Sequence, residues 1–209
     1  MQRRWSPPPR DAEATASAKP SELRASLRTL LRDATRREQR NVDRALAVLD
    51  LTERGDYQRF LCVHYAALGS LANKWREADR ADFEAMLDCL TRDLRALGSS
   101  IQNPAPGPHR NLAMSLRTWG VGYVIRASRS SCRLRRNRVA AGVATSYLDF
   151  SPQIAWPQFL LELELDVRSH QPHEVDQVIR GARTALSAFG SAAFDQIAAP
   201  EKDLELTLR

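Results

Sequence analysis

The chain has 209 residues, and 43% of them are hydrophobic, which suits one folded domain with tails and excludes wholesale disorder. It carries a net charge of +6, mostly from arginine, and its isoelectric point is near 9.7. This charge permits an anionic partner, but the arginines are scattered and few aromatic residues interleave them, which argues against nucleic acid.

Three widely spaced cysteines, Cys62, Cys89 and Cys132, match neither a disulfide framework nor a zinc module. No run of about 18 apolar residues is present, so the sequence predicts no transmembrane helix. The first residues also lack the apolar stretch of a secretory signal. We therefore expect a cytoplasmic protein without a metal site or a membrane partner.

Residues 1–20 are rich in proline, serine, alanine and charge, which indicates a flexible tail. Ser21 begins a predicted helix that runs to about Asp50, because apolar residues recur at helical spacing. One stripe of this helix contains Leu31, Thr35, Gln39, Val42 and Leu46. Gln39 is therefore predicted to point inward, either as a core glutamine with hydrogen-bond partners or as a position that once met a ligand.

Two shorter helices are predicted next. One opens at Gly55 and carries His64 among apolar residues, so we interpret His64 as structural rather than as a metal ligand. The other begins at Asp79 or Asp82 and ends at Gly98, the usual place for a glycine at a helix C-terminus.

A connection rich in proline and glycine follows at 99–110, and a long central stretch runs from 112 to 147. It begins as an apolar helix and passes Gly120 and Gly122, which let another group come close. Small side chains then share one face of the predicted helix, which would carry a shallow groove: Ala127, Ser128, Ser131 and Cys132. The arginines that come after them form a candidate interaction surface: Arg133, Arg135, Arg136 and Arg138.

The pattern predicts another helix at Trp156, with Pro157 in its first turn, and a last long helix that starts at Pro172. No segment alternates with a period of two for long enough to be a strand. The class is therefore all-α. We expect one helical domain at 21–198, between the flexible tail at 1–20 and a polar tail at 199–209.

Seven short motifs keep a fixed order along the chain: LLRDAT at 30–35, VD at 42–43, YQRFL at 57–61, DLRALG at 93–98, GYVI at 122–125, ATSYL at 144–148 and WPQFL at 156–160. This set resembles the bacterial haem oxygenases, especially those that make biliverdin for bacterial phytochromes. The resemblance covers about residues 23–198 and implies their all-α fold.

That family holds haem between a histidine on a proximal helix and a glycine-rich distal helix, and cleaves it to biliverdin, carbon monoxide and iron. The histidine position corresponds here to Gln39, whose carboxamide is a poor iron ligand. The distal motif of the family, Glu-Gly-Ser-x-Leu-Gly-Gly, falls on residues 126–132, where only Ser128 is kept. The resemblance thus implies a degenerate haem pocket, with no cofactor and no catalytic residue, at Gln39, Arg126, Ala127, Ser128, Ser131 and Cys132.

Arg126 occupies the place of the family's glutamate, and a buried guanidinium needs a partner. Either an acid such as Glu38 or Asp43 pairs with it and closes an empty pocket, or the pocket is open and holds an anion. We favour the closed pocket.

Three functions remain open. The preferred one is a non-catalytic pseudoenzyme that regulates a protein partner, such as a sensor kinase or another regulator. The second is an active haem oxygenase with altered iron ligation. The third is a binder of another tetrapyrrole or flat anion, in which Arg126 and Arg129 contact carboxylates. The sequence sets neither the identity of the partner nor whether the chain forms a homodimer.

Overall fold

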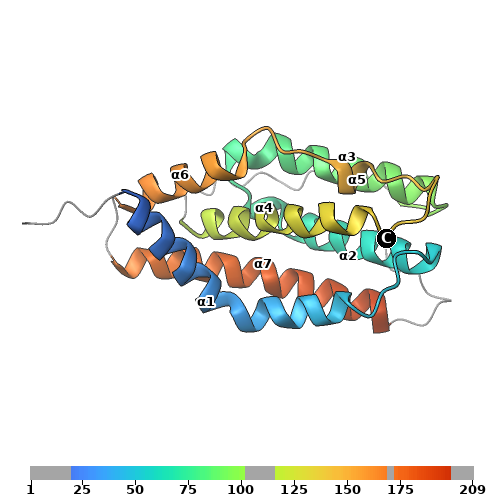
Figure 1. Cartoon of the computed structure of the whole chain (residues 1–209), viewed down its shortest axis with the longest axis horizontal. Coiled ribbons are helices and arrows are strands. Elements are labelled where there is room, and N and C mark those ends of the chain that lie inside the picture. Colours follow the sequence, from blue (N-terminus) through green and yellow to red (C-terminus); the bar gives the residue numbers. More distant parts are fainter. Residues whose placement is uncertain (1–19, 102–115, 169–171, 199–209) are drawn as a thin grey trace, which may run out of the picture.

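The structure is a computed structural model that describes residues 20–101, 116–168 and 172–198 (Figure 1). Nearly all of the two predicted tails and most of the predicted connection at 99–110 lie outside these residues. The described residues form helices and no strand, which confirms the all-α class. None of their helices is long and apolar enough to cross a membrane.

The helices follow the predicted order. They are α1 (Pro20–Leu46), α2 (Arg54–Ser70), α3 (Arg80–Ala96), α4 (Leu116–Arg136), α5 (Ser146–Asp149), α6 (Trp156–Arg168) and α7 (Pro172–Ala198), with two short 3-10 turns, η1 (Ala72–Lys74) and η2 (Glu77–Asp79), before α3. Gly98 follows α3, where the sequence predicts the end of this helix, and its φ of 85° is the left-handed conformation common at such ends. The helix in the central stretch ends at Arg136, and Gly142 makes a second left-handed turn before α5.

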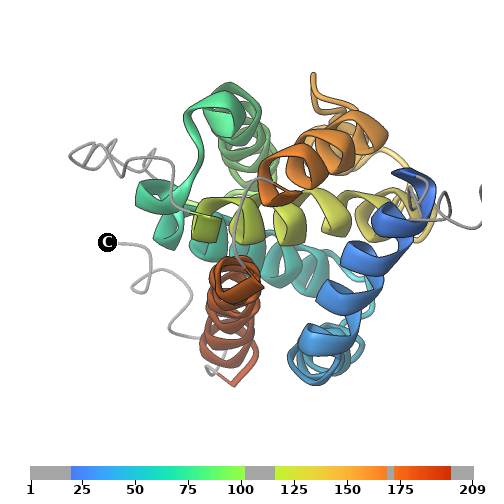
Figure 2. The same cartoon turned by 90° about the vertical axis from the view of Figure 1, so that its left-hand side faces the viewer.

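Helix α4 lies at the centre of the molecule. Both views place α3 and α6 on one side of it and α1 and α7 on the other (Figures 1 and 2). Its apolar side chains are buried, among them Val121, Val124 and Ile125 in the larger core and Trp119 in a smaller one with Leu31. Helix α7 packs against α4, α1 and α2, so it joins the helices that surround the centre.

The backbones of α4 and α7 touch where two glycines face each other. A Cβ atom added at Gly120 would lie 1.9 Å from the carbonyl oxygen of Val178, and one at Gly181 would lie 1.9 Å from that of Arg117. No real Cβ atom tolerates such a distance, so the two helices meet only because both positions are glycine. This confirms that Gly120 lets another group come close.

We predict that Gly120→Ala destabilises the protein by roughly 3 kcal/mol, because the new methyl group forces the two backbones apart. Thermal or urea unfolding followed by circular dichroism would measure the change. Gly69→Ala in α2 is the matched control, since an added Cβ there meets nothing within 4 Å. The control should be stabilised by about 0.5–1 kcal/mol through helix propensity. Equal stability of the two variants would contradict the close helix contact.

Candidate functional site

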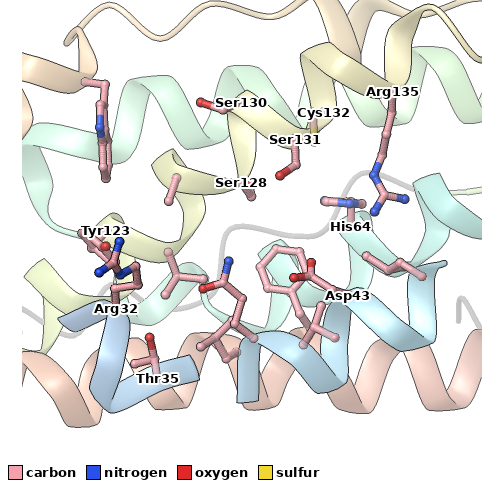
Figure 3. A pocket seen from close by; sticks show the side chains of 18 of the residues that line it. Arg32, Thr35, Asp43, His64, Tyr123, Ser128, Ser130, Ser131, Cys132 and Arg135 are labelled. Atoms are coloured by element: carbon pink, nitrogen blue, oxygen red, sulfur yellow. The ribbon is translucent and has the colours of Figure 1, made fainter. Parts of the chain in front are cut away.

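A cavity of about 300 Å³ opens between α1 and α4 (Figure 3). The wall on α1 includes Thr35, Gln39 and Val42, and the wall on α4 includes Val124, Ala127, Ser128, Ser131 and Cys132. Phe60 and His64 of α2 and Leu186 and Phe189 of α7 also line it. Its size is at the small end of pockets that take small molecules.

The small side chains of α4 explain why the two helices leave a space. Ala127, Ser128 and Ser131 are too short to reach across to α1, so the groove predicted from their spacing is present and has become one wall of the cavity. Gln39 faces this space and is exposed, while Thr35 and Val42 on the same stripe are buried. The interpretation of Gln39 as a buried core glutamine is therefore wrong, and its interpretation as a position that once met a ligand stays a prediction.

Positive charge lies at both ends of the cavity. Arg28 and Arg32 line one end, with the aromatic rings of Tyr123 and Trp156. Arg135 lines the other, where its Cζ atom lies 5.5 Å from the centroid of the Phe60 ring. Figure 3 shows Arg32 near Tyr123, and Arg135 with Asp43 and His64 at the far side. Arg32 and Asp43 are separated by about 16 Å along α1, so the cavity is elongated.

The sequence analysis missed the arginines of α1, although their signal was present. Arg28, Arg32, Thr35 and Gln39 step by four, three and four residues, so they continue the stripe on which Gln39 lies. The predicted stripe begins at Leu31, so it includes neither arginine at this end of the cavity.

His64 is fully packed within the wall and remains neutral. It is 3% exposed, its Nδ1 atom lies 2.7 Å from the hydroxyl oxygen of Tyr147, and its Nε2 atom has no hydrogen-bond partner. Burial, and then the positive charges of Arg129 and Arg135, lower the pKa of His64 to about 3. Its ring rests between Phe60 and Phe189, as expected for a structural histidine, but it also lines the cavity.

Arg126 lies on the opposite face of α4 from the cavity. Its guanidinium donates hydrogen bonds of 2.8 Å to the carboxylates of Asp79 and Asp82 and to the carbonyl oxygen of Ile154. The prediction of a buried internal salt bridge is confirmed, but the proposed partners Glu38 and Asp43 are wrong. Because the salt bridge forms away from α1, it does not close the cavity.

Arg129 also points away from the cavity. Its guanidinium donates to the carbonyl oxygens of Tyr147, Leu148 and Phe150 at the end of α5, and it lies 4.5 Å from the Tyr147 ring centroid. The prediction that Arg126 and Arg129 contact a ligand is therefore wrong, since both side chains are occupied within the core.

The arginines after residue 132 do not form one surface. Arg135 turns toward the cavity, whereas Arg133 donates to the hydroxyl of Ser151 and Arg136 pairs with Asp149. Arg138 is exposed in the turn beyond α4. Only the last three remain candidates for contact with a partner.

The cysteine thiols are free. Cys132 lines the cavity and is buried, as is Cys62, and burial raises the pKa of both thiols, that of Cys62 to about 11. Within the described ranges no group of three histidine, cysteine, aspartate or glutamate side chains is placed to hold a metal ion.

Comparisons of the chain with protein-family models, with curated proteins and with solved structures found no match. The cavity must therefore be interpreted from its own residues, and the resemblance to haem oxygenases depends on the sequence motifs alone.

We predict that Arg126→Leu lowers the free energy of unfolding by about 3–5 kcal/mol, because it leaves the carboxylate of Asp82 buried without a cation and that of Asp79 with Arg76 alone. Arg133→Leu removes the same charge from an exposed position of α4 and should change stability by less than about 0.5 kcal/mol. Chemical denaturation of both variants would measure the difference. Similar losses would contradict a buried role for Arg126.

The neutral His64 also predicts a pH dependence. The unfolded chain protonates this imidazole below its ordinary pKa near 6.5, whereas the folded protein keeps it neutral down to about 3. The unfolded state therefore binds more protons, and the free energy of unfolding falls by about 2 kcal/mol between pH 7 and pH 5. Denaturation curves across this range, with His64→Gln as a control that does not titrate, would show the effect. Parallel curves for the two proteins would contradict it.

Proposed function

We propose that the protein binds a flat organic anion in the cavity between α1 and α4, leaves it chemically unchanged, and regulates a protein partner in response. The observation that carries this proposal is an open cavity with arginines at both ends and walls that mix apolar and aromatic side chains with small polar ones. Arg28 and Arg135 make no ion pair within the described part of the chain, so their charges are free for an anion.

We also propose that the protein has the fold of the haem oxygenases, because its sequence motifs occur in the order found in that family. The residues at the cavity do not fit haem as that family holds it. Gln39 presents an amide in place of the proximal histidine, and Ala127, Ser131 and Cys132 carry side chains in place of the distal glycines. A pseudoenzyme that forms no biliverdin is consistent with this wall.

The volume of the cavity supports a small ligand. About 300 Å³ is at the lower limit of the roughly 300–1,000 Å³ of small-molecule pockets, which favours an aromatic acid of a few rings over a whole tetrapyrrole. The aromatic side chains of Phe60, Tyr123 and Trp156 would contact such rings.

A surface next to the cavity supports a protein partner. Leu134 is 78% exposed on the outer side of α4, directly beside Arg135 in the chain and between the exposed Arg133 and Arg138. An apolar side chain among arginines is suited to a partner with an acidic rim, for which a sensor kinase or another regulator remains our proposal.

One observation favours a second candidate, an active haem oxygenase with altered iron ligation. His64 lines the cavity with an unpartnered Nε2 atom, and it is the one imidazole among the lining residues of the described chain. An imidazole is a good iron ligand, so haem bound from α2 rather than from α1 is the alternative to be tested.

We predict that anilinonaphthalene sulfonate binds at least tenfold more tightly than phenylnaphthylamine, which has the same rings without the sulfonate. One charge-assisted hydrogen bond accounts for this ratio. Fluorescence titration would measure both affinities, and Ala127→Trp, which fills the cavity, should weaken both. Equal affinities, or binding that survives Ala127→Trp, would contradict the proposal.

A haem titration followed by absorbance separates the second candidate from the first. The proposal predicts no imidazole-type Soret band in the unmodified protein. A band that appears and is then abolished by His64→Ala would support haem binding from α2. A band that appears only in Gln39→His would support loss of the ancestral ligand as the reason for the altered function.

A further inference from the structure

One polar atom in the cavity wall lacks a partner, and its surroundings indicate what it binds. The Nε2 atom of His64 is buried without a hydrogen bond, between the rings of Phe60 and Phe189, whose centroids lie 4.4 and 5.2 Å from that of the imidazole. Folded proteins seldom leave a buried polar atom unpaired, and a site that awaits a ligand is one reason to do so. The ring lies at the same end of the cavity as Arg135 (Figure 3).

Tyr147 determines which nitrogen of His64 carries the proton. Its hydroxyl lies 2.7 Å from Nδ1, and burial raises the pKa of this phenol well above its ordinary value, so it stays protonated. The hydroxyl can donate to Nδ1 or to the nearby sulfur of Cys132, and nitrogen is much the stronger acceptor. We therefore assign the proton of the neutral ring to Nε2, which makes the unpartnered atom a donor.

The local charges favour an anionic acceptor. Arg129 and Arg135 both lie close enough to His64 to oppose its protonation, and neither forms an ion pair with a described acid. Asp43, which is exposed on the α1 wall, is the carboxylate that faces this end of the cavity. The end therefore combines net positive potential with one neutral donor.

We propose that Arg135 and the Nε2–H group of His64 form an oxyanion subsite for the carboxylate or sulfonate of an aromatic acid, with Tyr147 as the positioning residue. The inference rests on the proposed function of the cavity and adds which end binds the charged group and through which atoms.

The other end of the cavity is a weaker anion site. Arg28 and Arg32 are exposed, and Arg32 also lies 3.8 Å from the carboxylate of Asp33. Charges in contact with solvent are screened, whereas Arg135 is half-buried over the Phe60 ring beside a desolvated donor. The rings of the ligand would then extend from Phe60 toward Tyr123.

The assigned tautomer also opposes iron ligation. A nitrogen that carries a proton has no lone pair for a metal, so ligation through Nε2 would require the proton to move to Nδ1 and the Tyr147 hydroxyl to turn to Cys132. The hydrogen bond from Tyr147 thus favours an oxyanion over an iron centre.

The test compares the two naphthalene probes in charge-matched variants. Arg135→Gln should weaken anilinonaphthalene sulfonate about tenfold or more and leave phenylnaphthylamine within twofold, because only the charged group contacts the subsite. Arg133→Gln removes the same charge two residues away, outside the cavity, and should change neither affinity. Asp43→Asn should strengthen binding of the sulfonate, because it removes the opposing charge.

Variants at the histidine test the donor itself. His64→Phe keeps a ring of similar shape and should also reduce the preference for the sulfonate about tenfold. Tyr147→Phe should reduce this preference without weakening phenylnaphthylamine, an outcome that a purely structural role would not give. Imidazole nitrogen NMR shifts of the unmodified protein provide a readout independent of any variant, and they should report the proton of His64 on Nε2.

Three results would overturn the inference. NMR shifts that place the proton on Nδ1 would remove the donor. Sulfonate binding that survives Arg135→Gln and His64→Phe but is lost in Arg28→Gln would move the anion to the other end and leave the proposed function standing. Failure of both probes to bind the unmodified protein would overturn the subsite and the proposed function together.

Discussion

The orientation of α4 depends on the buried ion cluster that Arg126 forms with Asp79 and Asp82. The carboxylate of Asp79 also accepts from the guanidinium of Arg76, and that of Asp82 accepts from the backbone amide of Gln153. The cluster therefore ties α4 to η2, to α3 and to the segment before α6. If this cation turned away, Asp82 would stay buried without a cation and Asp79 would keep only Arg76. With Arg126 fixed toward α3, the small side chains one and two positions later must face α1.

A second constraint, on the other side of α4, is the glycine contact with α7. It sets the distance between these two backbones, while Leu31 and Leu46 anchor α1 in the smaller and the larger core. Arg183 of α7 pairs with Glu38 and donates to the carbonyl oxygen of Ala34, which supports the middle of α1. Because α1 and α4 are held by other contacts, the short side chains between them leave a preformed space instead of a collapsed interface.

The sequence predicts which residues share one face of a helix, but not which helices lie against that face. Helical spacing placed Gln39 on one stripe and Ala127, Ser128 and Ser131 on one face, and the structure sets these two faces opposite each other. The same spacing could not tell which helix neighbours Arg126, since its acids lie 44 and 47 residues earlier in the chain. Charge alone favoured Glu38 or Asp43 as the partner of Arg126. The partners in the structure are Asp79 and Asp82, which are buried beside it.

The protonation states around the cavity explain why binding, rather than proton-transfer chemistry, suits these residues. General acid–base catalysis works best when a group has a pKa near the working pH. Here burial lowers the pKa of His64 to about 3 and raises those of Tyr147 and Cys132, so all three stay neutral near pH 7. A protonated thiol is a weak nucleophile, and a neutral imidazole held by a phenol is a fixed donor. The burial that keeps His64 from exchanging protons therefore also makes its ring a stable contact for an anion, with Tyr147 holding it in place.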